Sequence, residues 1–207
     1  MSKQVLNIRS LGAEGAKVVR HNAAQRSTQE HRSSPALEEF QRSVHRYFTC
    51  FAFATKGFEM VRLSMPAAES AEQRLFIGNG PPESGSALAR IGLAEAHDFL
   101  LRDGLFTDAI AKSLLVRIYS EWEEKFRSEL AAELGLLAAS VTCDLMGDVR
   151  LIRNWIVHDK SVVQRDVSRI KVVNWPMKPG DELIITMGRF EELMIEVNRM
   201  VVAIAFR

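Results

Sequence analysis

The sequence predicts a mainly α-helical protein, a bundle of four or five helices with one small β-hairpin near the C-terminal helix. Three observations support this fold class. Apolar residues recur every three or four positions over long stretches, which is the spacing of one helix face. Pro and Gly gather at a few points between those stretches, where helices end. Residues 169–186 combine two short β-branched runs with a Pro-Gly turn, which is typical of a hairpin.

Length and composition favour a single globular domain. The chain has 207 residues, 47% hydrophobic and 26% charged, so it can bury a core without disulfides or metals. The net charge of +1 means that any binding of nucleic acid must come from a local patch.

Cys50 and Cys143 lack zinc-ligand spacing, and we expect buried free thiols of a reducing compartment. No apolar leader follows Met1 and no apolar run could span a membrane, so a cytoplasmic location is expected.

Residues 1–34 predict a mobile basic arm, because positive side chains outnumber negative ones and periodicity is weak. The helical domain is expected over residues 35–207. Its first helix should begin near Pro35, since proline favours the first helical position, and should end before Pro66. Residues 78–85 are rich in Gly and Pro and predict a loop.

The later elements follow from the same rules. Thr107 and Asp108 predict an N-terminal cap for the most regular helix of the chain. The polar side of that helix, residues 121–127, is interpreted as a solvated face. The predicted elements are helices over residues 36–65, 86–102, 107–134, 144–158 and 190–204, and strands over residues 169–175 and 182–186.

The run from Arg153 to His158 carries the residues best suited to chemistry. Asn154 and His158 are four positions apart, so on a continuous helix they share one face. Arg153 and His158 are five apart and diverge on an ideal helix. The two therefore converge only if the helix loosens, caps or bends near His158. A histidine in the last turn also lies beside the negative end of the helix dipole, which favours its protonated form.

These residue types suit cleavage of RNA without a metal, in which the 2′-hydroxyl attacks the adjacent phosphorus. Histidine titrates near working pH, so His158 could act as the general base or acid. The guanidinium of Arg153 matches phosphate oxygens and stays charged, and Asn154 could orient the imidazole or contact the phosphate. A structural alternative stays open, in which these side chains cap helix carbonyls and pair with Asp144 or Asp148.

The run Arg153-Asn154-x-x-x-His158, late in a helical domain, resembles the Arg-x4–6-His motif of the HEPN superfamily, where a polar residue often follows the arginine. Residues 148–159 resemble the signature helix of that family, and the helix with Trp122-Glu123-Glu124 resembles its central helix. The resemblance covers about residues 36–206 and is strongest to the RiboL-PSP and MAE-type bacterial groups. The predicted hairpin would be an addition to the minimal bundle.

The resemblance implies a helical bundle, often a homodimer in which the two motifs face each other across the interface. It implies a metal-independent endoribonuclease of a toxin–antitoxin or phage-defence system, with RNA as substrate and an antitoxin or defence protein as partner. Arg153, Asn154 and His158 would be catalytic. Lys160 is a candidate contact to RNA phosphate, and Trp155 could stack on a base if it is exposed. Other members of the family lack catalysis and bind a partner protein or nucleotide, which is the alternative function.

Other chemistries lack their residue patterns. The histidines outside the motif have no partners at metal-ligand spacing, so no metal is predicted; they are His21, His31, His45 and His97. The loop at residues 78–85 lacks the Gly-Lys-Ser/Thr ending of a phosphate-binding loop and follows no predicted strand, so no cofactor is expected. The basic arm is interpreted as an unstructured tail, with contact to RNA phosphates as the alternative.

Overall fold

The structure, a computed structural model, describes residues 28–31, 34–80 and 87–205. The α-helices are α1 (Pro35–Ser64), α2 (Leu93–Phe99), α3 (Leu105–Glu121), α4 (Arg127–Glu133), α5 (Asp144–His158) and α6 (Met187–Arg199). The strands are β1 (Thr28–His31), β2 (Arg74–Gly78), β3 (Ala87–Gly92), β4 (Val141–Thr142) and β5 (Val202–Ala205). A π-helical turn, Trp122–Phe126, joins α3 to α4. The prediction of a mainly helical bundle with a small antiparallel hairpin is confirmed.

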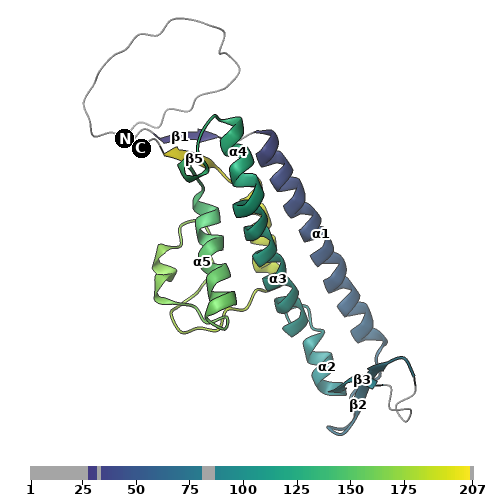
Figure 1. Ribbon diagram of the computed structural model, residues 1–207. Coiled ribbons are helices and arrows are strands. Elements are labelled where there is room, and N and C mark those ends of the chain that lie inside the picture. Colours follow the sequence, from purple (N-terminus) through teal and green to yellow (C-terminus); the bar gives the residue numbers. More distant parts are fainter. Residues whose placement is uncertain (1–27, 32–33, 81–86, 206–207) are drawn as a thin grey trace, which may run out of the picture.

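The helices α1, α3 with α4, and α5 lie side by side, and α6 packs against α1 and α3 (Figure 1). Aromatic rings fill the centre of this bundle. The ring of Phe40 lies 5.3 Å from the ring of Trp122, between centroids, and Phe51 lies 4.5 Å from Phe190. All four side chains are buried, so these contacts stabilise the bundle through both apolar burial and ring geometry.

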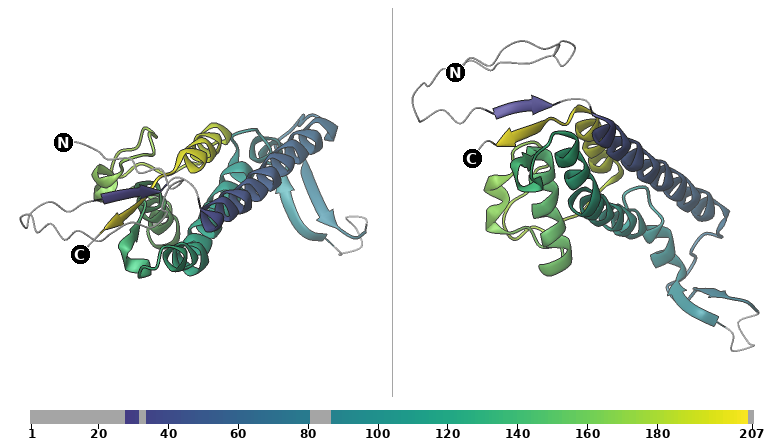
Figure 2. Two further views of the ribbon diagram at one scale, coloured as in Figure 1. Left: turned by 90° about the horizontal axis from the view of Figure 1, so that it is seen from above. Right: turned by 45° about the horizontal axis from the view of Figure 1, so that its top comes forward.

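The bounds of α1 match the sequence signals at both ends. Pro35 is the first helical residue, and the Ser34 hydroxyl accepts a hydrogen bond from the Leu37 amide at 3.1 Å. The helix ends at Ser64, two residues before Pro66, as predicted. None of its side chains beyond Thr55 is buried, and this end of α1 projects from the bundle together with the β2–β3 hairpin (Figure 2).

The hairpin lies elsewhere than predicted. Residues 86–102 were expected to form one helix, but the structure has β3 followed by the short helix α2, and β3 pairs with β2. The strands predicted over residues 169–175 and 182–186 do not form. Carboxylates take their backbone donors instead: Asp148 accepts the amides of residues 171–173, and Asp108 accepts the amide of Ile185 at 2.6 Å. Donors used in this way cannot form a strand ladder.

Asp108 therefore does not cap its helix, which was predicted to begin there. Gly104 occupies the cap position one turn earlier, and no side chain accepts a hydrogen bond at this end. Asp108 is buried and also pairs with Lys112 at 2.6 Å. A buried carboxylate is stable only with such partners, and here they connect α3 to the chain before α6.

The C-terminal helix is shorter than predicted and is followed by a strand. It ends at Arg199, and β5 lies between β1 and β4 in a three-stranded antiparallel sheet. Val202 and Ile204 are buried while Ala203 is half-buried, an alternation with the period of a strand. Strand β1 belongs to the segment predicted as a mobile arm; residues 1–27 of that arm lie outside the described part of the chain.

Both cysteines are free, as expected, but Cys50 is exposed and Cys143 half-buried. The expectation that both are buried is wrong for Cys50, because its neighbour Phe51 points into the core. None of the described helices is long and apolar enough to cross a membrane.

Candidate functional site

The burial of one face of α5 fixes the orientation of the predicted motif. Ile152 and Trp155 are buried on either side of Arg153 and Asn154, which remain half-buried, and His158 is exposed at the helix end. Trp155 is only 1% exposed, and its indole N–H donates to Asp166 at 2.9 Å. It cannot stack on a base in this position, so the predicted RNA contact at Trp155 is wrong. Its role is to anchor α5 to the segment that follows.

The three polar motif residues, here called the motif cluster, converge on one nitrogen atom. Arg153 Nη1 donates to Asn154 Oδ1 at 3.1 Å and lies 3.0 Å from His158 Nε2. A guanidinium only donates hydrogen bonds, so this contact is a hydrogen bond in the tautomer that carries the ring proton on Nδ1 and accepts at Nε2. The long arginine side chain bridges the five-residue spacing without a break in α5, which ends directly after His158.

The motif cluster keeps hydrogen-bonding capacity that the described residues do not use. Arg153 Nε is buried and has no hydrogen-bond partner in this part of the chain. A buried donor without an acceptor costs about 1–3 kcal/mol, and such an atom in a folded protein calls for an explanation. One explanation is a site that is kept ready for a ligand rather than for stability.

The turn after α5 places a further cation near the motif in sequence. The amides of Asp159 and Ser161 both donate to the carbonyl of Trp155, at 3.2 and 2.9 Å. Lys160 and Ser161 adopt left-handed φ values of 54° and 60°, a conformation that costs roughly 1–2 kcal/mol for each non-glycine residue. The Lys160 side chain is exposed and forms no ion pair with any described residue, so its charge is free for a ligand.

One part of the structural alternative, the pairing of the motif residues with Asp144 or Asp148, does not occur in the structure. Asp148 is buried, and its carboxylate is occupied by the backbone amides of Lys171, Val172 and Val173. Asp144 pairs with the Lys171 ammonium at 2.6 Å. Neither aspartate bonds to the motif cluster, whose side-chain hydrogen bonds among the described residues join its own members.

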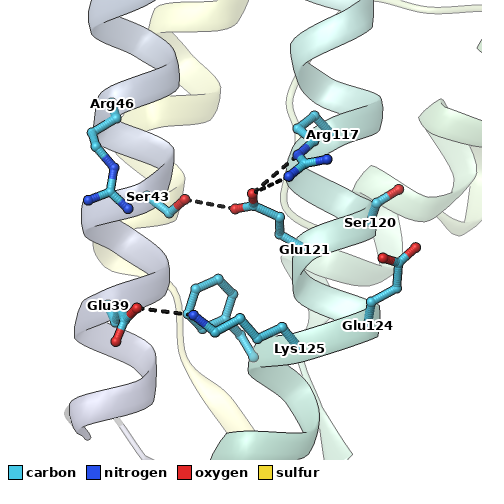
Figure 3. Close-up of a pocket in the computed structure, with 9 residues that line it drawn as sticks. Glu39, Ser43, Arg46, Arg117, Ser120, Glu121, Glu124 and Lys125 are labelled. Atoms are coloured by element: carbon cyan, nitrogen blue, oxygen red, sulfur yellow. Dashed lines mark hydrogen bonds and ion pairs between the residues drawn. The ribbon is translucent and has the colours of Figure 1, made fainter.

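A second polar cluster, which sequence reasoning missed, lies between α1 and α3 (Figure 3). Glu121 accepts hydrogen bonds from the Ser43 hydroxyl at 2.7 Å, from the Tyr47 hydroxyl, and from Arg117 Nε at 3.2 Å. Burial tends to raise the pKa of the Glu121 carboxyl, but the hydrogen bonds from Tyr47, Ser43 and Arg117 outweigh it and lower that pKa. We call these four residues the Glu121 cluster; it holds an ionised carboxylate with its acceptors in use.

A cavity of about 280 Å³ lies beside the Glu121 cluster, where the π-helical turn faces α1 (Figure 3). Arg46 and Glu124 line it, and Lys125 bonds to Glu39 across it at 3.1 Å. The solvated-face interpretation is right for the exposed Glu124 and Lys125 and wrong for the half-buried Glu121. In the sequence, the Glu121 cluster was indicated only by the four-residue spacing of Arg117 and Glu121, and this spacing is common on any charged helix.

The described residues contain no group of three or more His, Cys, Asp or Glu side chains placed to hold a metal ion. Among the described residues we take the motif cluster as the candidate site, because it combines an imidazole, a fixed cation beside it and solvent access. Comparison with models of protein families, with curated proteins and with solved structures gives no match.

Proposed function

We propose that this protein is a metal-independent endoribonuclease, as its resemblance to the HEPN superfamily implies. The observation that carries the proposal is the 3.0 Å contact between Arg153 Nη1 and His158 Nε2. It supports the proposal because a permanent positive charge lies beside an imidazole nitrogen at an exposed helix end. Cleavage of a phosphodiester by its 2′-hydroxyl needs a base close to that hydroxyl and a positive charge close to the neighbouring phosphate oxygens.

The proposed reaction begins when a phosphate enters and Arg153 transfers its hydrogen bond from the imidazole to a phosphate oxygen. His158 Nε2 then accepts the proton of the 2′-hydroxyl. The bond between O2′ and phosphorus forms, and the bond from phosphorus to O5′ breaks, which leaves a 2′,3′-cyclic phosphate and a 5′-hydroxyl. Arg153 stabilises the charge on the phosphate oxygens in the transition state. Asn154 orients the guanidinium through its 3.1 Å hydrogen bond, and Lys160 adds positive charge at the helix end.

The O5′ leaving group must take up a proton, and one imidazole cannot hold and release protons at the same moment. A second copy of the chain would solve this, with its own His158 acting as the acid while the first acts as the base. We therefore propose a homodimer in which two motif clusters face each other, acting in a toxin–antitoxin or phage-defence system with an antitoxin or defence protein as partner.

The test is cleavage of total RNA and tRNA by purified protein in EDTA. Wild type is compared with His158→Ala and Arg153→Ala, and with His45→Ala as the matched control, since His45 is an exposed histidine on α1 whose ring bonds to Asn198 and lies outside the motif cluster. We expect 2′,3′-cyclic phosphate ends from wild type and His45→Ala, and loss of cleavage in the other two. Equal cleavage by folded His158→Ala would contradict the proposal, as would no cleavage by any of the proteins.

The second candidate is a non-catalytic module that binds a partner protein, and one observation favours it. Large apolar side chains are exposed at the projecting end of α1 and on the hairpin: Met60 is 63%, Leu63 69% and Leu88 79% exposed. Apolar residues gathered on a surface often mark a protein interface. Under this candidate His158→Ala changes only stability, dimerisation or partner affinity, whereas Leu63→Ser abolishes the association.

A further inference from the structure

A groove of about 190 Å³ lies between α5 and the C-terminal end of α3, two helices that lie side by side in Figure 1. Tyr119 and the π-helical turn line one side of it, and Cys143, Gly147 and Arg150 line the other. A Cβ atom added at Gly147 would meet no heavy atom within 4 Å, so the surface of α5 is open to the groove at that point. The groove is separate from the cavity beside the Glu121 cluster, which lies on the α1 side of α3.

The groove and the motif cluster occupy one continuous face of α5. Gly147, Arg150, Asn154 and His158 follow each other at steps of three or four residues, which places them along one side of the helix. Arg150 is one turn before Asn154, and four residues of α-helix span about 6 Å along the axis. A strand bound at the motif cluster can therefore continue along α5 into the groove.

Positive charge gathers in the groove, and part of it is unpaired. Burial raises the pKa of the Tyr119 phenol, as does the charge of Glu123, while Arg150, Arg127 and Arg153 act to lower it. Of these arginines, Arg127 and Arg150 line the groove together with Tyr119. Arg127 is paired with Glu123 at 2.8 Å. The exposed Arg150 forms no hydrogen bond or ion pair with the described residues, so its charge is free for a phosphate.

We infer that this groove is a nucleotide subsite next to the cleavage position, where Arg150 binds the phosphate neighbouring the scissile one and the Tyr119 ring stacks on its base. The inference rests on the proposed RNA-cleaving function and deepens it. An arginine beside an aromatic ring is the combination that binds single-stranded RNA without strict sequence preference. The open helix surface at Gly147 lets the strand lie close to α5.

The test uses a single-stranded RNA hexanucleotide with 2′-O-methyl groups throughout, which cannot be cleaved, and the same hexanucleotide with one free 2′-hydroxyl. Binding of the first and cleavage of the second are measured for wild type, Arg150→Ala, Tyr119→Leu and Tyr119→Phe. Arg42→Ala is the matched control, because it removes one exposed positive charge on α1. Thermal unfolding of each variant shows that the fold is intact.

We expect Arg150→Ala to weaken binding and to reduce the slope of log affinity against log salt by about 0.7, the loss of one phosphate contact on a single strand. Tyr119→Leu should weaken binding by about 5-fold or more, the effect of losing one stacked base. Tyr119→Phe and Arg42→Ala should bind like wild type. KM should rise in the two weakened variants while kcat stays close to wild type, since neither residue contacts the reacting atoms.

The possible failures are distinguishable. Equal affinity and salt dependence for Arg150→Ala and Arg42→Ala would overturn the subsite, even if wild type cleaves RNA. Binding that depends on Arg150 without cleavage by wild type would support the subsite and overturn the nuclease. A folded wild type that neither binds nor cleaves either oligonucleotide would overturn both.

Discussion

The motif cluster on α5 and the Glu121 cluster between α1 and α3 differ in how far their polar groups are used. The Glu121 carboxylate accepts from Ser43 on one oxygen and from Tyr47 and Arg117 on the other. In the motif cluster one nitrogen of Arg153 serves both of its acceptors, and the buried Nε has none among the described residues. The first cluster is satisfied by the fold, and the second is not.

This difference separates two functions that polar clusters can have. A satisfied carboxylate joins the helices that supply its donors, so it contributes to stability and offers little to a ligand. A cluster with spare donors and an accessible base loses stability but can bind and react. Mutations in the motif cluster should therefore lower activity and leave stability intact, whereas mutations in the Glu121 cluster should lower stability and leave activity intact.

The largest effect is expected from Arg153→Met, which keeps the length of the side chain and removes its charge. Cleavage of RNA should fall by about 100-fold or more, the usual consequence of removing one group that stabilises transition-state charge. The midpoint of thermal unfolding should stay the same or rise, because a buried donor without an acceptor is removed. Initial rates and thermal unfolding measured on the same sample check both parts. A marked loss of stability would show that Arg153 is structural.

The reverse result is expected from Glu121→Ala. Removing the carboxylate leaves three donors without their acceptor, which should reduce the free energy of unfolding by about 1–3 kcal/mol. For a chain of this size that lowers the unfolding midpoint by roughly 2–4 °C per kcal/mol. The cleavage rate should be unchanged, because the cluster lies on the α1 side of α3. Glu124→Ala is the matched control, since Glu124 is exposed and forms no hydrogen bond with the described residues; a similar loss there would make the comparison invalid.

Acid should weaken the Glu121 cluster selectively. The folded-state pKa of Glu121 is lowered, so its stabilising contribution is present above the unfolded-state pKa of about 4.3 and is lost as the pH falls through the lower folded-state value. The difference in unfolding free energy between wild type and Glu121→Gln should thus be constant between pH 5 and pH 7 and should shrink below about pH 4. Urea unfolding at a series of pH values measures it. A difference that persists at the lowest pH would mean that charge on Glu121 is unimportant.

Local signals in the sequence were enough for the bounds of α1 and for the shared helix of Asn154 and His158. Pro35 and Pro66 bound the first helix because proline acts on its own turn, and the spacing of Asn154 and His158 placed them on one face. The contact between Arg153 and His158 needed only residues within one helix. What could not be predicted depends on partners distant in sequence: Ser43 lies 78 positions from Glu121.

Distant partners also explain the errors. Residues 169–175 have the composition of a strand, but Asp148 takes their backbone amides from 23 to 25 positions away. Trp155 was a candidate base-stacking residue from its place in the motif, and only the fold shows that its N–H is bonded to Asp166. In each case a tertiary contact decided between two outcomes that the local pattern allowed equally.

The smallest effect is expected from Lys125→Ala, which opens the cavity beside the Glu121 cluster without touching its carboxylate. Lys125 bonds to Glu39 at 3.1 Å, but about half of each side chain is exposed, 48% and 49%. Exposed ion pairs gain little, because water screens them and ordering two long side chains costs entropy. The unfolding midpoint should therefore move by less than about 1 °C, and added salt should remove even that difference. A shift as large as that of Glu121→Ala would place Lys125 within the satisfied cluster, and proximity rather than burial would then decide which of these charges stabilise the fold.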